Sequence, residues 1–143
     1  MDKIVKASPT KEFFVNMLVR DILLKQAIIE LIDNSIDGAR SIRKEKDYSG
    51  LKICVYFDKD KFVIEDNCGG IPLDIAANYA FRFGRPKTVE SGNAETTGIF
   101  GIGMKRALFK IGNNFSIHST TKTTEFQLDL NVKEWLEKNY CRF

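Results

Sequence analysis

Hydrophobic and polar residues in the stretch Gln26–Arg40 recur with the period of an α-helix, and the polar positions gather on one side. Glu30, Asn34 and Asp37 stand at i, i+4 and i+7, so a helix places them on one face. The opposite face, which we expect to pack on a sheet, carries Ile28, Leu31, Ile32 and Ala39. An acidic stripe of this kind is either a solvated helix face or part of a binding site, and the later motifs favour the site.

The remaining patterns predict several short helices and strands. Helices are predicted at Lys11–Arg20, Leu73–Phe81, Met104–Ile111 and Val132–Tyr140, and strands at Lys52–Phe57, Lys61–Glu65, Phe115–Thr120 and Thr124–Asn131. The first helix follows a hydroxyl cap at Ser8-Pro9-Thr10, and Asp21 is expected to cap the helix of Gln26–Arg40. The stretch Gly84–Thr97 has almost no apolar residue, which is typical of a functional lid or a disordered segment.

Composition narrows the class of protein. The 143 residues suffice for one domain with a real core, and 43% hydrophobic with 29% charged residues is ordinary for a soluble protein. A net charge of +3 is too small to indicate nucleic acid or a membrane surface. Cys54, Cys68 and Cys141 form no C-x-x-C pair, which argues against a disulfide framework or a zinc site. His118 is the only histidine, and no signal peptide or membrane-spanning run is present, so we expect a cytoplasmic protein.

The turn D-N-C-G-G-I-P begins at Asp66, directly after a predicted strand. A carboxylate there can accept a hydrogen bond from an exocyclic amine such as that of adenine. Gly69 and Gly70 would let a base lie against the backbone, where a side chain would block it. On its own the motif is a weak signal, because a strand that ends in D-N-x-G-G is more often an ordinary glycine turn.

A second glycine-rich motif, G-I-F-G-I-G-M-K, runs from Gly98 to Lys105 at a predicted helix start. Backbone N–H groups and the helix dipole converge at such a point, which suits phosphate groups, and the lysine adds a positive charge. The motif is not a P-loop, because no G-K-[ST] follows. It also lacks the preceding βαβ strand that a dinucleotide fingerprint requires.

The acidic stripe supplies the remaining chemistry of a magnesium–nucleotide site. Asn34 offers a neutral oxygen, which suits Mg²⁺ held mainly by water and phosphate. Glu30, one turn earlier, could orient and deprotonate a water for attack on a γ-phosphate. Asp37 could anchor lid or loop backbone, or a water beside the base.

The three motifs, in this order, resemble the GHKL ATPase superfamily, which includes the gyrase B subunit, the ninety-kilodalton heat-shock chaperones, MutL and the sensor histidine kinases. E-L-I-D-N-S-I-D-G is similar to the N-box, which implies Glu30 as general base and Asn34 as magnesium ligand. D-N-C-G-G-I-P is similar to the box whose aspartate reads the adenine amine, here Asp66. The implied nucleotide-binding residues are Asn34, Asp37, Asp66, Gly70, Ile71, Gly98, Gly101, Ile102, Gly103, Met104 and Lys105. The lysine after the last glycine most resembles MORC proteins and their bacterial relatives.

Two features depart from the superfamily pattern. Cys68 stands where the usual D-x-G-x-G box has its first glycine, which either reshapes the turn or replaces one small residue with another. No Gly-Thr pair follows the glycine box, although the superfamily normally carries a late threonine there. We therefore expect the N-terminal portion of a longer protein, or a reduced domain.

The resemblance implies an α+β Bergerat fold, a two-layer sandwich with helices on one face of a mixed, mostly antiparallel sheet. It implies one ATP-binding domain over residues 1–143, with residues 84–103 as the ATP lid. The expected function is Mg²⁺-dependent binding of ATP or ADP with slow ATP hydrolysis, lid closure and a possible nucleotide-driven homodimer formed through segments outside the chain. A nucleotide-binding switch without useful turnover is the alternative. A DNA or protein client has no sequence signal here, and a histidine kinase lacks its phosphoacceptor helix.

Overall fold

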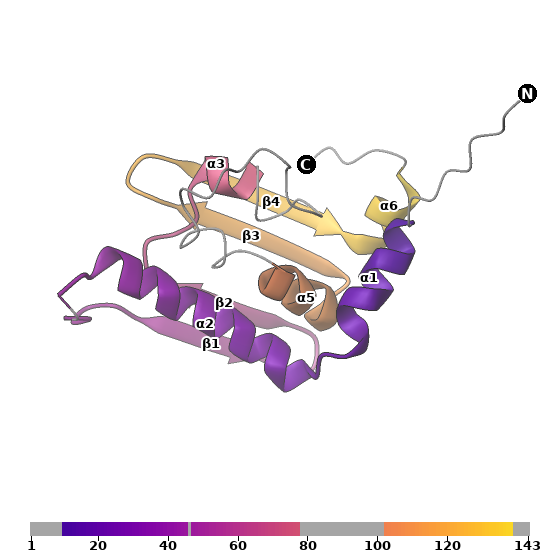
Figure 1. Cartoon of the computed structure of the whole chain (residues 1–143), viewed down its shortest axis with the longest axis horizontal. Coiled ribbons are helices and arrows are strands. Elements are labelled where there is room, and N and C mark those ends of the chain that lie inside the picture. Colours follow the sequence, from indigo (N-terminus) through magenta and orange to yellow (C-terminus); the bar gives the residue numbers. More distant parts are fainter. Residues whose placement is uncertain (1–9, 46, 78–101, 139–143) are drawn as a thin grey trace, which may run out of the picture.

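The computed structural model describes residues 10–45, 47–77 and 102–138. Figure 1 shows its helices and strands. In chain order they are α1 (Lys11–Arg20), α2 (Leu24–Ile42), β1 (Ile53–Phe57), β2 (Phe62–Asp66), α3 (Leu73–Ile75), α5 (Ile102–Ile111), β3 (Asn114–Thr120), β4 (Glu125–Asn131) and α6 (Val132–Glu137). The predicted order of helices and strands is confirmed.

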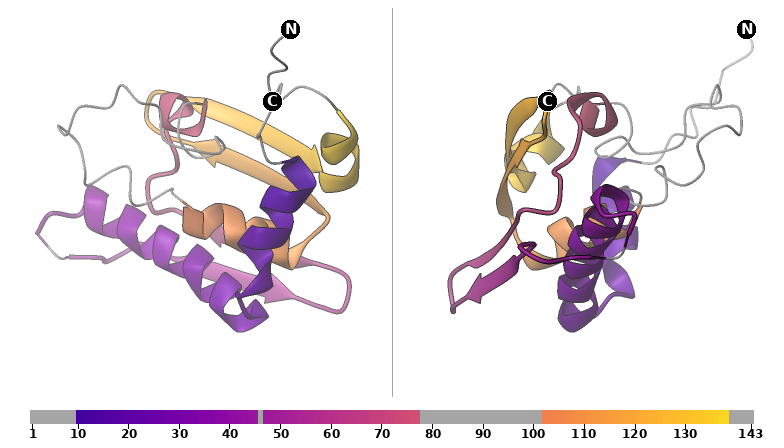
Figure 2. Two further views of the ribbon diagram at one scale, coloured as in Figure 1. Left: turned by 45° about the vertical axis from the view of Figure 1, so that its right-hand side comes forward. Right: turned by 90° about the vertical axis from the view of Figure 1, so that its left-hand side faces the viewer.

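The strands form two antiparallel hairpins. β1 pairs with β2 from Ile53↔Asp66 to Phe57↔Phe62, and β3 pairs with β4 from Asn114↔Asn131 to Thr120↔Glu125. Within the described residues these are two separate two-stranded sheets rather than one mixed sheet. Figure 2 shows the strands in one layer, with α1 and α2 in a second layer on one side of them. The α+β, two-layer prediction is confirmed.

The start of α2 differs from the prediction. Asp21 does not cap this helix: it terminates α1, and its carboxylate pairs with Arg20 at 3.2 Å. α2 instead begins after Leu23, whose N–H donates to the side-chain oxygen of Gln26 at 2.9 Å. Asp21 lies too far before the first turn of α2 to reach its free N–H groups, so the prediction was wrong.

The core forms where α5 packs against α2 and α1. Ala27 of α2 and Ala107 of α5 are both fully buried beside Ile22, with Leu31 and Ile111 packed around them. Alanine at the crossing removes the bulk that would separate the two helix axes. This close contact fixes the start of α5 relative to the polar stripe of α2.

A smaller cluster joins the two ends of the described chain. Trp135 of α6 is 5% exposed, and its ring lies 5.7 Å from that of Phe109 in α5. Lys11 of α1 lies over the same indole, 4.7 Å from its centroid. α6 ends at Glu137, and residues 139–140 of the predicted longer helix lie outside the described residues. None of the helices in the described ranges is both long enough and apolar enough to cross a bilayer.

Candidate functional site

Two of the three predicted motifs lie wholly within the described residues: the stripe on α2 and the turn that begins at Asp66. The third is described only from Ile102 onward, where α5 begins. Gly98 and Gly101 therefore lie outside the described residues, as does the predicted lid apart from Ile102 and Gly103. The site can be built from α2, β2 with its following turn, and the start of α5.

Glu30 lies against the start of α5. The carboxylate oxygen Oε2 of Glu30 occupies the space that a Cβ on Gly103 would need. Gly103 is the second residue of α5, so the carboxylate lies at the end of the helix where the first backbone N–H groups have no intrahelical partner. The structure thus brings together two residues that are distant in sequence and were both predicted to belong to the nucleotide site.

Asn34 lies one turn further along α2 and is half-buried. Its amide nitrogen Nδ2 is fully buried and has no hydrogen-bond partner within the described residues. A buried polar atom left unpaired is unfavourable, and such atoms recur where a ligand or water is bound. The amide therefore fits a residue that completes its bonds on ligand binding. Within the described residues, no group of three or more acidic, histidine or cysteine side chains that could hold a metal occurs.

Asp37, the third residue of the stripe, is paired along the helix itself. Its Oδ1 accepts a hydrogen bond from Nη1 of Arg40 at 2.9 Å, and both side chains are substantially exposed. Such exposed pairs at i, i+3 stabilise a helix only slightly. The partners predicted for Asp37, lid backbone or a water beside the base, are not tested by this pairing.

Asp66 ends β2 and is exposed, with each carboxylate oxygen held by one donor. Oδ1 accepts the backbone N–H of Cys68 at 2.8 Å, and Oδ2 accepts the hydroxyl of Ser35 at 2.6 Å. The aspartate therefore has a fixed orientation and retains lone pairs for a ligand. Ser35 was not singled out in the sequence, since a serine beside polar residues on a helix usually indicates solvation.

The glycine turn after Asp66 is pressed between α2 and β3. A Cβ on Gly38 of α2 would lie 2.7 Å from the carbonyl oxygen of Cys68. Gly70 has φ of +68°, and a Cβ there would collide with the carbonyl oxygen of Thr120. These two contacts require glycine and set the position of the turn.

Ser119 of β3 fixes the next residue of this turn. The N–H of Ile71 donates to the Ser119 hydroxyl at 2.7 Å, and that hydroxyl lies 3.2 Å from the carbonyl oxygen of Ile71. Ser119 itself is 6% exposed. No local pattern marks Ser119 in the sequence, because its role depends on a contact across the fold.

Cys68 fits the turn as a small buried residue. Its side chain is 2% exposed, and burial raises the pKa of its thiol. The backbone N–H of Cys68 donates a hydrogen bond to the Asp66 carboxylate, so a cysteine in place of the usual glycine is compatible with a formed turn.

The residues at the start of α5 differ in exposure. Ile102 is 64% exposed, whereas Met104 and Lys105 are buried. Burial lowers the pKa of the Lys105 ammonium. A lysine predicted to meet phosphate is therefore largely inside the protein.

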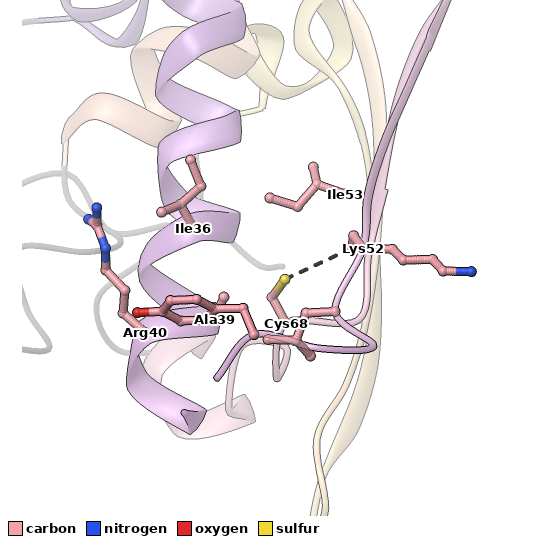
Figure 3. Close-up of a pocket in the computed structure, with 8 residues that line it drawn as sticks. Ile36, Ala39, Arg40, Lys52, Ile53 and Cys68 are labelled. Atoms are coloured by element: carbon pink, nitrogen blue, oxygen red, sulfur yellow. Dashed lines mark hydrogen bonds between the residues drawn. The ribbon is translucent and has the colours of Figure 1, made fainter. Parts of the chain in front are cut away.

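A shallow hollow of about 410 Å³ lies between α2 and β1 (Figure 3). Its lining comprises Ile36, Ala39, Arg40, Tyr48, Leu51, Lys52, Ile53 and Cys68. In Figure 3 the side chains of Arg40 and Lys52 extend away from the hollow, while Cys68 faces the backbone of Lys52, with its sulfur 3.9 Å from that carbonyl oxygen. The hollow does not include Glu30, Asn34 or Asp66 and is separate from the candidate site.

Comparisons with curated proteins and with solved structures gave no match. A family model did match, over residues 22–141, and is described as the histidine kinase-, DNA gyrase B- and HSP90-like ATPase. The matched range contains α2, the Asp66 turn and α5, the elements that build the site. The predicted superfamily is confirmed, while the nearer resemblance to MORC proteins stays a prediction. The chain therefore belongs to the histidine kinase-, DNA gyrase B- and HSP90-like ATPase family and carries an ATP-binding domain of that type.

Proposed function

We propose that the chain binds ATP with Mg²⁺ between α2, the Asp66 turn and the start of α5, and hydrolyses it slowly. The observation that carries the proposal is the contact between the Glu30 carboxylate and Gly103. A helix N-terminus attracts phosphate groups, and a carboxylate at the same point is placed to act on a water beside them.

Each residue of the site has a distinct role in this proposal. Glu30 orients a water and accepts its proton, while the first N–H groups of α5 hold phosphate oxygens. Asp66 accepts a hydrogen bond from the amine of the base. Its two internal hydrogen bonds support this role because they keep its oxygens in place.

Asn34 is the proposed magnesium ligand. It would hold the metal through its side-chain oxygen, while its buried Nδ2, which has no partner among the described residues, could donate to an oxygen of the bound nucleotide or of a water. Bound Mg²⁺ would supply positive charge against the phosphate oxygens. Closure of residues 84–103 over the nucleotide, and nucleotide-driven pairing of two chains, stay predictions.

A nucleotide-binding switch without useful turnover is the second candidate. The burial of the Lys105 side chain favours it, because a lysine largely covered by protein is less available to the charge that develops on a phosphate during transfer. The two candidates share the binding site and differ only in phosphate release by the unmodified chain.

The decisive experiment measures phosphate release and ADP affinity for the wild type and for Glu30→Ala. Loss of a general base lowers turnover about 10²–10⁴-fold. We expect this loss of turnover with the ADP affinity retained, because Glu30 acts on the attacking water and does not contact the adenine. Glu65→Ala, an exposed change on β2, is the control. Unchanged turnover in Glu30→Ala would remove the assigned role, and binding without phosphate release in the wild type would establish the switch.

A further inference from the structure

Ser35 has one hydroxyl proton and two acceptors within reach. Its Oγ lies 2.6 Å from Oδ2 of Asp66 but 3.5 Å from the carbonyl oxygen of Leu31, one turn earlier in α2. The shorter contact takes the proton, since a hydroxyl donates only once and 3.5 Å is at the limit of hydrogen bonding. Ser35 is 8% exposed, so the protein itself holds its hydroxyl against Asp66.

Two donors fix the Asp66 carboxylate where one would not. The torsion that turns a carboxylate about its Cβ–Cγ bond is broad, so a single hydrogen bond leaves the group free to swing. The Cys68 N–H holds Oδ1 and the Ser35 hydroxyl holds Oδ2, which defines the plane of the group. Acceptor lone pairs lie near that plane, so its orientation decides which donors on a ligand can be met.

The backbone around this pair is held rigidly enough to preserve the geometry. Gly38 lies three residues after Ser35 on α2, and its Cα meets the carbonyl of Cys68 so closely that no Cβ fits. The turn that carries the Cys68 donor is thus packed against the helix that carries the Ser35 donor. Ser35 and Cys68 therefore reach Asp66 from two elements in contact with each other.

We propose that Ser35 is a positioning residue that fixes Asp66 and thereby selects nucleotides with an exocyclic amine over those with a keto oxygen at the same ring position. The inference rests on the proposed nucleotide site. An ionised carboxylate only accepts hydrogen bonds, so a keto oxygen opposite it leaves two acceptors facing each other. A bound base would cover Asp66, and polar groups that are covered without a partner are a main source of strong discrimination between close analogues.

The test measures the affinities of ADP and of inosine diphosphate by calorimetry. Inosine diphosphate replaces the adenine amine with a keto oxygen and carries a hydrogen on the neighbouring ring nitrogen, and the ratio of the two dissociation constants reports the selectivity between the two bases. We expect the wild type to favour ADP at least ~10-fold, and Ser35→Ala to lower that ratio about 5-fold or more. A purely structural role for Ser35 would weaken both ligands equally and leave the ratio unchanged.

Two further variants complete the design. Ser41→Ala is the matched control, because Ser41 is on the same helix but its hydroxyl donates to the Gly38 carbonyl instead of Asp66. Ser35→Thr keeps the hydroxyl and should keep the ratio. Melting curves for each variant establish that it is folded.

Asp66→Asn separates failure of this inference from failure of the proposed function. An amide can donate to a keto oxygen, so this variant should favour inosine diphosphate. If Asp66→Asn shifts the ratio while Ser35→Ala does not, the positioning role of Ser35 is overturned. If the wild type does not discriminate, or Asp66→Asn leaves the ratio unaltered, the assignment of Asp66 to the base fails, and with it this inference.

Discussion

At the scale of single residues, the position of Glu30 depends on the absence of a side chain at Gly103. A Cβ at this position would overlap the Glu30 carboxylate, which is the flexible end of a side chain and can move aside. Alanine also favours a helix by roughly 1 kcal/mol over glycine in a helix interior. Gly103→Ala should therefore leave the melting temperature nearly unchanged while turnover falls about tenfold or more, because the base is displaced.

A double-mutant cycle tests whether Gly103 acts through Glu30. In a Glu30→Ala background the Gly103→Ala change should have no further effect on residual phosphate release, since the displaced group is already missing. Independent, multiplicative losses would show instead that a Cβ at Gly103 disturbs the phosphate-binding end of α5 directly.

Site residues could be predicted from sequence where a local pattern marked them. Glu30 and Asn34 share a helix face at i, i+4, and Asp66 precedes a glycine turn, so short windows revealed them. Ser35 and Ser119 were missed because their partners lie 31 and 48 residues away in the chain. A lone serine on a helix or strand carries no local signal that distinguishes a buried hydrogen bond from a solvated hydroxyl.

At the scale of elements, periodicity located each helix and strand, but not their mutual arrangement. The first helix was predicted to the residue, and the strand boundaries to within one. Leu23, not Asp21, is the N-cap residue of α2, and its N–H donates to the side chain of Gln26, because capping depends on the distance to the first free N–H groups as well as on residue type. The division into two hairpins depends on pairing between distant segments, which local alternation does not encode.

The junction between α1 and α6 gives a prediction at this scale. Nζ of Lys11 lies 3.0 Å from the carbonyl oxygen of Trp135 and 2.6 Å from that of Lys138, at the end of α6, and over the Trp135 ring. Lys11→Met keeps the apolar stem but removes the charge. We expect a loss of about 1–3 kcal/mol in the free energy of unfolding, since charge-assisted hydrogen bonds and a cation–π contact are both removed.

Denaturant unfolding followed by the fluorescence of Trp135, the single tryptophan of the chain, measures this loss at the junction itself. Lys133→Met, an exposed lysine on the same short helix, serves as the matched control and should change stability by less than about 0.5 kcal/mol. Equal effects of the two changes would mean that Lys11 does not tie α1 to α6.

At the scale of the whole molecule, the site joins α2, the Asp66 turn and α5, so nucleotide binding should stabilise the fold as a unit. ADP with Mg²⁺ at about 100 times its dissociation constant adds roughly 2.7 kcal/mol. For a chain of this length that corresponds to a rise in melting temperature on the order of 10 °C. The shift should shrink when a chelator removes Mg²⁺, because the proposed contact through Asn34 is then lost.

The variant Asn34→Ala distinguishes the proposed contact with Mg²⁺ from the proposed contact with the nucleobase. This variant should keep a smaller shift with ADP that no longer responds to Mg²⁺, whereas Asp66→Ala should lose most of the shift at every Mg²⁺ concentration. The buried Nδ2 of Asn34 has no partner to lose among the described residues, so the variant without ligand should be nearly as stable as the wild type. If the wild type is folded and its melting temperature changes with neither ADP nor ATP, the proposed site as a whole is contradicted.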